Sequence, residues 1–165
     1  MYKLLTFLVV SVMWCSVVFA QVNTGSLTAR GEADWEKMNI DTTTEGGKWL
    51  TNTYKPYLWE LLKAMERFIT QIKFDNTVSA EEIQSKTKQA QSEYYNSIQN
   101  ITPPPELKEY HSKMLQMIAE NIKSTSINEA LEDRLIKETS LELERVFREH
   151  GVPQNIIEEL NKSRK

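Results

Sequence analysis

The sequence has one cysteine, Cys15, and two histidines among its 165 residues. Because Cys15 lies inside an apolar N-terminal segment, the chain that follows it contains no thiol and can form no disulfide bond. Zinc-finger sites, thiol catalysis and redox-active CxxC chemistry are therefore excluded. The stability of the folded chain must come from the packing of apolar side chains.

Glycine and proline are also scarce through the middle of the chain. None of the five glycines lies between Lys48 and His150, and the prolines in that span are Pro56 and the run at 103–105. Both residue types interrupt regular structure, so their positions outline the elements and predict long helices between these points. The proline run must end one helix, and the same prolines can begin the next.

Motifs that carry catalytic chemistry are absent. The chain has no GxSxG, GxxxxGK[ST], HExxH or GxGxxG pattern. The residues three positions before His111 and His150 are Lys108 and Phe147, so the Glu-x-x-His pairs of di-iron bundles are missing. We therefore expect a protein that is not an enzyme and uses no cofactor. A net charge of −3 also argues against a nucleic-acid partner, which favours a basic face.

The N-terminus has the pattern of a secretory signal peptide. Lys3 precedes an apolar run of 15 residues, Leu4–Val18, and the small residue Ala20 follows it. The run is shorter than the roughly 18 apolar residues that a membrane-spanning helix needs. We expect cleavage after Ala20 and export of the mature chain to the periplasm or the extracellular medium, without stable insertion in a membrane. The alternative is that the segment is retained as a membrane anchor.

Four stripes of apolar residues recur at three- and four-residue steps and predict four amphipathic helices. The first covers about residues 53–74, the second begins after Ser79, the third follows the proline run and the fourth ends near His150. Apolar residues beyond that point predict a short C-terminal helix that packs back on the others. Because the connections are short, the expected fold is an all-α, four-helix up-and-down bundle.

This pattern divides the chain into three parts. Residues 1–20 are the expected signal peptide, and residues 48–165 are the helical bundle domain. Residues 21–47, which are rich in Gln, Asn, Thr, Gly and Ser, are expected to form a polar, partly disordered leader with one short helix around Ala33–Met38.

Local signals predict where individual helices begin and end. Ser79 followed by Glu82 has the spacing of a capping box, and Gly151 is placed to stop the fourth helix. The polar stretch at 124–128 is poor in helix formers and predicts a break between the third and fourth helices. The alternative is one continuous helix that reaches His150.

Trp59 is unusual because it falls roughly opposite the apolar stripe of its predicted helix, beside Lys55 and Lys63. Tryptophan is enriched at binding hot spots, and lysines four residues away on either side can add cation–π contacts. These three residues are a candidate binding surface, unless the leader or the C-terminal helix covers Trp59. Ile127 and Leu141 also point away from their stripe and form a second candidate patch.

His111, Met114 and Met117 recur every three residues and share a broad side of the third helix. Imidazole and thioether groups are ligands suited to Cu(I). The preferred interpretation is core packing, because His111 and Met114 lie on the apolar stripe and methionine commonly fills gaps there. A metal site at these three residues is the less favoured alternative.

The sequence therefore predicts an exported, non-enzymatic helical bundle that binds another protein or self-associates. The alternative function is a bundle that holds a small ligand or a soft metal such as copper between its helices. A third possibility is a cell-envelope protein that its N-terminal segment anchors in the membrane.

Overall fold

The computed structural model describes residues 26–72, 79–123 and 129–162. Helix is the regular secondary structure throughout these ranges, and they contain no strand, which confirms the predicted all-α class. The predicted signal peptide and Cys15 lie outside them. The elements, in chain order, are α2 (Leu27–Lys37), α3 (Glu45–Trp49), the π-helical turn η2 (Leu50–Tyr54), α4 (Lys55–Gln71), α5 (Ala80–Gln99), the 3-10 turn η3 (Pro105–Leu107), α6 (Lys108–Lys123), α7 (Glu129–Glu149) and α8 (Gln154–Lys162).

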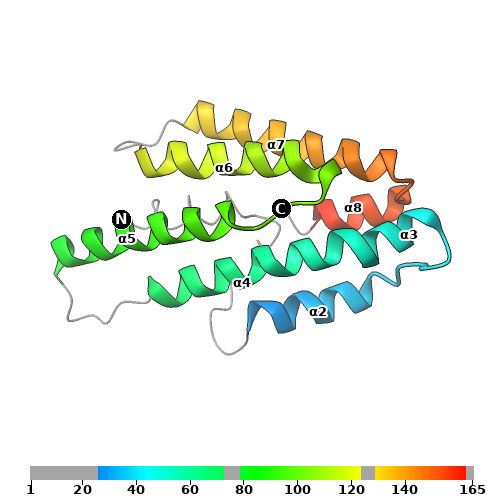
Figure 1. The fold of residues 1–165 in the computed structure, drawn as a ribbon, viewed down its shortest axis with the longest axis horizontal. Coiled ribbons are helices and arrows are strands. Elements are labelled where there is room, and N and C mark those ends of the chain that lie inside the picture. The colour runs from blue at the N-terminus through cyan, green and yellow to red at the C-terminus, as the bar shows by residue number, and fades with distance from the viewer. Residues whose placement is uncertain (1–25, 73–78, 124–128, 163–165) are drawn as a thin grey trace.

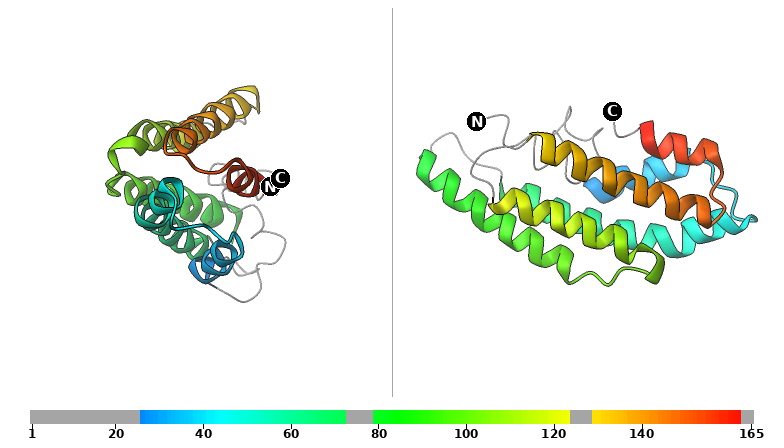
Figure 2. Two further views of the ribbon diagram at one scale, coloured as in Figure 1. Left: turned by 90° about the vertical axis from the view of Figure 1, so that its right-hand side faces the viewer. Right: turned by 90° about the horizontal axis from the view of Figure 1, so that it is seen from above.

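The long helices α4, α5, α6 and α7 run alternately in opposite directions (Figure 1). Contacts join α4 to α5, α5 to α6, and α6 to α7. The predicted count of four helices is not confirmed, because α2 packs against α4, α8 contacts α7, and both add buried side chains to the core. Figure 2 shows α2 and α7 on opposite sides of α4 in its left-hand view.

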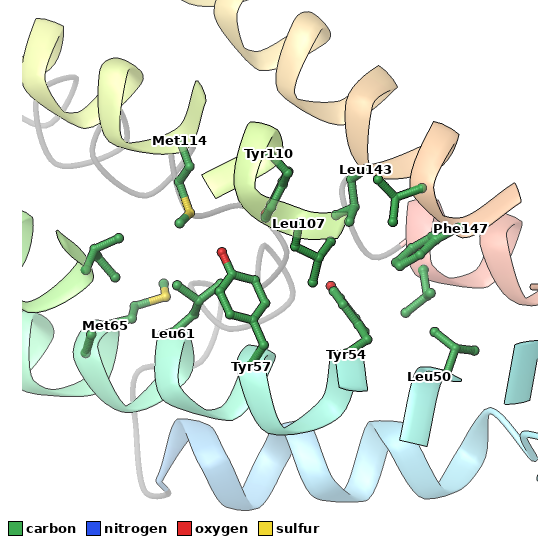
Figure 3. Close-up of a cluster of buried hydrophobic side chains, with 14 of the residues drawn as sticks. Leu50, Tyr54, Tyr57, Leu61, Met65, Leu107, Tyr110, Met114, Leu143 and Phe147 are labelled. Carbon is green, nitrogen blue, oxygen red and sulfur yellow. The ribbon is translucent and has the colours of Figure 1, made fainter. Parts of the chain in front are cut away.

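The core lies between these helices and is rich in aromatic side chains. Tyr54 from η2, Tyr57 from α4, Tyr110 from α6 and Phe147 from α7 converge there with leucines and methionines (Figure 3). The packing thus supplies the stability that a chain without disulfide bonds requires. No helix among the described residues is long and apolar enough to cross a membrane.

The first long helix begins earlier than predicted. It starts at Glu45, where the Thr44 side chain accepts a hydrogen bond from the Gly47 amide at 3.0 Å, and continues through α3 and η2 into α4. A helix that began near residue 53 would have Pro56 in its first turn, but Pro56 lies inside a longer helix. In a regular α-helix Pro56 would have no N–H to donate, and its ring would crowd the carbonyl four residues earlier. The π turn η2, which precedes it, changes the hydrogen-bond pattern there and accommodates the proline.

The predicted short helix in the leader is present but longer. The prediction covered Ala33–Met38, whereas α2 covers Leu27–Lys37 and buries Leu27 and Trp35. Gly31 allows α2 to approach α4 closely, since a Cβ there would lie 2.9 Å from a methyl carbon of Leu62. Sequence reasoning missed this packing because only two residues of α2 are buried.

Two predicted helix ends are confirmed. The Ser79 side chain accepts a hydrogen bond from the Glu82 amide at 3.2 Å, which is one half of the predicted capping box; the Glu82 carboxylate pairs with Lys86 instead. At the end of α7, Gly151 has a positive φ of 69° and its amide bonds to the Arg148 carbonyl. These bonds fix where α5 begins and where the chain turns toward α8.

The predicted break between the third and fourth helices is consistent with the structure. α6 ends at Lys123 and α7 begins at Glu129, and the two helices pack against each other. A single helix running through both segments would be straight and its halves would not meet, so the continuous alternative is wrong. Residues 124–128, and Ile127 with them, lie outside the described residues.

Candidate functional site

Trp59 is partly buried, and α2 provides its cover. The Trp35 ring meets Trp59 edge-on with 5.9 Å between ring centroids. The Lys55 ammonium lies 5.0 Å from the Trp59 centroid and 5.6 Å from that of Trp35, and it pairs with Glu32 of α2 at 2.6 Å. Leader residues therefore cover Trp59, as the alternative interpretation expected. Lys63 does not join this cluster and pairs with Glu60 at 2.7 Å.

Leu141 is the one large apolar side chain among the described residues that is exposed, with 56% of its surface accessible. Charged residues of α7 surround it in intrahelical ion pairs, Arg134 with Glu138 and Arg148 with Glu144. A single exposed leucine of this kind is ordinary on a protein surface. Ile127, the other residue of the predicted patch, lies outside the described residues.

His111, Met114 and Met117 are all buried on α6. His111 uses its Nδ1 in a hydrogen bond of 2.9 Å with the Tyr57 hydroxyl. Within the described ranges, no three His, Cys, Asp or Glu residues gather as metal ligands. The burial of all three residues agrees with the core-packing interpretation.

The Tyr57–His111 pair joins α4 to α6. Tyr57 rises from α4 toward α6 (Figure 3). Burial raises the pKa of the Tyr57 phenol well above its usual range, and the neighbouring Tyr110 and Tyr94 raise it further. Burial lowers the pKa of His111. Both groups are therefore neutral near pH 7, and the bond between them satisfies polar atoms that would be costly to bury alone.

A second aromatic cluster fixes one end of the fold. The Trp49 ring stacks on His150 with 4.5 Å between centroids, and its indole N–H donates to Glu106 at 2.8 Å. That hydrogen bond is the main reason the pKa of Glu106 is lowered. The cluster ties α3, η3 and the end of α7 together. The hydrogen bond and the stacked ring pair are both made within the cluster, so we assign it a structural role.

A hollow in the described structure lies beside α4 and the end of α5, and we call it the α4–α5 groove. It is an open groove with a volume of about 550 Å³. One wall comes from η2 and α4, and the other from the C-terminal part of α5 and the extended segment after it. The lining residues are Thr53, Pro56, Tyr57, Glu60, Arg67, Ser97, Asn100, Ile101, Thr102 and Pro104.

The groove is elongated. Thr53, Glu60 and Arg67 are spaced seven residues apart, which places them along one line of the helix. At about 1.5 Å per residue the line is about 20 Å long. Tyr57 lies deepest, with only 4% of its surface accessible, and its bond to His111 holds it there.

The two charged residues of the lining differ in their partners. The Glu60 carboxylate is neutralised by Lys63. Arg67 donates from Nε to the Lys63 carbonyl at 3.3 Å, and its two terminal nitrogens make no hydrogen bond within the described residues. The groove thus presents hydroxyl and amide groups along its length, and one positive charge that forms no ion pair with a carboxylate of the described residues.

Comparison of the chain with protein families, with curated proteins and with solved structures finds no match. The groove must therefore be judged on its own geometry. Sequence reasoning missed it because its walls come from segments that are far apart in the chain, residues 53–67 and 97–104. The proline run was interpreted only as the end of one helix and the start of the next.

Proposed function

We propose that this protein is an exported, non-enzymatic helical protein that binds another protein through the α4–α5 groove. In this proposal α4–α7 form a four-helix up-and-down bundle that α2 and α8 supplement. The shape of the groove carries the proposal. Small-molecule pockets are mostly enclosed and apolar. This groove is open, and Pro56, Ile101 and Pro104 are its three wholly aliphatic residues among ten. An open, polar trough about 20 Å long suits a segment of another chain.

Self-association through α7 is the weaker form of the protein-binding hypothesis. Two copies of α7 paired antiparallel about Leu141 would set Glu138 opposite Glu144 of the second copy. The same pairing would set Arg134 opposite Arg148. Like charges directly opposed across an interface are unfavourable, and one leucine offers little apolar area in return.

Two matched positions on α5 test the groove. Ser97 lines it, whereas Ser92 is exposed on the same helix outside the lining. A photo-crosslinking phenylalanine analogue at each position, in cells that express the protein, should capture a defined partner from position 97 and not from position 92. Mass spectrometry then identifies that partner for purification.

The purified partner is next titrated calorimetrically with three proteins. Ser97→Trp, which fills the groove, should weaken binding at least tenfold, and Ser92→Trp should bind like the unmodified protein. Circular dichroism melts of both variants check that they fold. Equal binding by all three proteins, or equal crosslinking from both positions, would refute a groove-based function.

Export is tested separately by intact-mass analysis of the secreted or periplasmic protein. The expected mass corresponds to a chain that begins at Gln21, after removal of the 20 preceding residues. A full-length mass in the membrane fraction would instead support the anchored alternative.

A further inference from the structure

The guanidinium of Arg67 indicates what the groove can hold. Arg67 is exposed on α4, its Nε donates to the Lys63 carbonyl at 3.3 Å, and no described residue pairs with its two terminal nitrogens. Two parallel N–H groups match the two oxygens of a carboxylate, which an arginine binds in bidentate fashion. Because Lys63 already neutralises Glu60, the free charge of the lining is that of Arg67.

The opposite wall has a complementary property. Pro104 has no N–H, and its carbonyl already accepts a hydrogen bond from the Leu107 amide at 2.9 Å. Pro104 has φ −53° and ψ 149°, in the polyproline II region. Asn100 and Thr102 add an amide and a hydroxyl group to this wall, and these can pair with the backbone groups of a peptide.

The length of the groove agrees with such an occupant. An extended chain advances about 3.3–3.6 Å per residue, so about 20 Å accommodates roughly six residues. The positive charge of Arg67 attracts a carboxylate of such an occupant to its end of the groove.

We propose that the α4–α5 groove binds an extended peptide segment of the partner, with a carboxylate of that segment held by Arg67. This inference rests on the proposed function and specifies its ligand. A glycan fits less well, because sugars are commonly bound by stacking on exposed aromatic faces and the aromatic residue of the lining, Tyr57, is 4% exposed. The carboxylate belongs either to the C-terminus of the partner or to an Asp or Glu side chain.

The probe is a library of hexapeptides attached through their N-termini and carrying free C-terminal carboxylates. The peptide that binds best is resynthesised with a fluorescent label and titrated by fluorescence anisotropy. Arg67→Gln should weaken its binding at least tenfold, and Arg67→Lys, which keeps the charge but loses the bidentate geometry, should weaken it less. The matched control is Arg134→Gln, an exposed arginine on α7 outside the lining, which should have no effect.

Two modified peptides identify the source of the carboxylate. Loss of binding on C-terminal amidation assigns it to the chain end, and loss on Asp→Asn or Glu→Gln replacement assigns it to a side chain. Unchanged binding to Arg67→Gln, or a library without any binder at millimolar concentration, would overturn the inference. If Ser97→Trp abolishes partner binding while Arg67→Gln does not, the groove function stands and the carboxylate assignment fails.

Discussion

Replacing Trp59 with alanine should lower the free energy of unfolding by about 2–3 kcal/mol. The edge-to-face contact with Trp35 is worth about 0.5–1.5 kcal/mol, and the Lys55 ammonium at 5.0 Å adds about 0.5–1 kcal/mol. Loss of partly buried area accounts for the remainder. The total stays below the roughly 3–5 kcal/mol of a fully buried aromatic residue, because Trp59 keeps some exposure.

Urea unfolding followed by far-UV circular dichroism measures this loss. With a denaturant slope of about 1–3 kcal/mol per molar, the midpoint should fall by about 1 M. The double variant with Trp35→Ala should lose less than the two single variants combined, because the first replacement already removes the shared contact. The control Leu141→Ala, at an exposed position, should change stability by less than about 0.5 kcal/mol.

Two outcomes would contradict this reasoning. A loss below about 0.5 kcal/mol for Trp59→Ala would mean that α2 does not cover the ring and that Trp59 is a surface residue. Strict additivity with Trp35→Ala would mean that the edge-to-face contact is absent in solution. The first outcome would restore Trp59 as a candidate for partner binding.

Four further predictions concern other parts of the fold. Gly46→Ala should lower the free energy of unfolding by about 3 kcal/mol or more in a urea melt, because the added Cβ would lie 2.2 Å from the Gly151 carbonyl oxygen. An unchanged urea midpoint would contradict that close approach. The free energy of unfolding should decrease as the pH falls below about 6.5, because the folded-state pKa of His111 is lowered and the unfolded chain therefore binds a proton at His111 first. His111→Gln should flatten the plot of stability against pH between about pH 7 and 5.5. An equal slope in the variant would exclude His111 as the cause. Leu141→Glu should sediment like the unmodified protein. A lower sedimentation coefficient in the variant would show that α7 mediates self-association. Pro56→Ala should raise the free energy of unfolding by about 1 kcal/mol in a urea melt, because alanine restores a backbone donor inside the helix; a loss of stability would contradict the view that Pro56 costs the helix a hydrogen bond.

Signals that act over a few residues predicted their local structure well. Ser79 marks the start of α5 and Gly151 the end of α7 as expected, because capping depends on hydrogen bonds to residues a few positions away. The apolar stripes likewise gave the long helices, since a helical period is encoded within each segment. α2 was underestimated because its leucine and tryptophan are buried by tertiary contacts, such as that of the Trp35 ring with Tyr54 of η2, which no local pattern encodes.

The candidate sites were harder to predict than the helices. The helical wheel placed Trp59 opposite the stripe of its own helix, and the ring that covers it, Trp35, comes from a segment classed as a leader. The pattern of His111 and two methionines was visible, but its hydrogen-bond partner Tyr57 lies 54 positions away. The groove requires α4 and the end of α5 to be side by side, which is a property of the tertiary structure.

The two breaks in helical regularity that the prolines impose meet at the groove. Pro56 is accommodated by the π turn η2, and the run at 103–105 keeps the chain extended after α5. Each costs helical hydrogen bonds that an uninterrupted bundle would keep. Departures from local preference are most often tolerated where they serve function, and π turns occur frequently at functional sites. Here Pro56 and Pro104 both line the same groove, which also holds the uncompensated charge of Arg67. That coincidence favours the groove over the isolated Leu141 as the surface through which the protein acts.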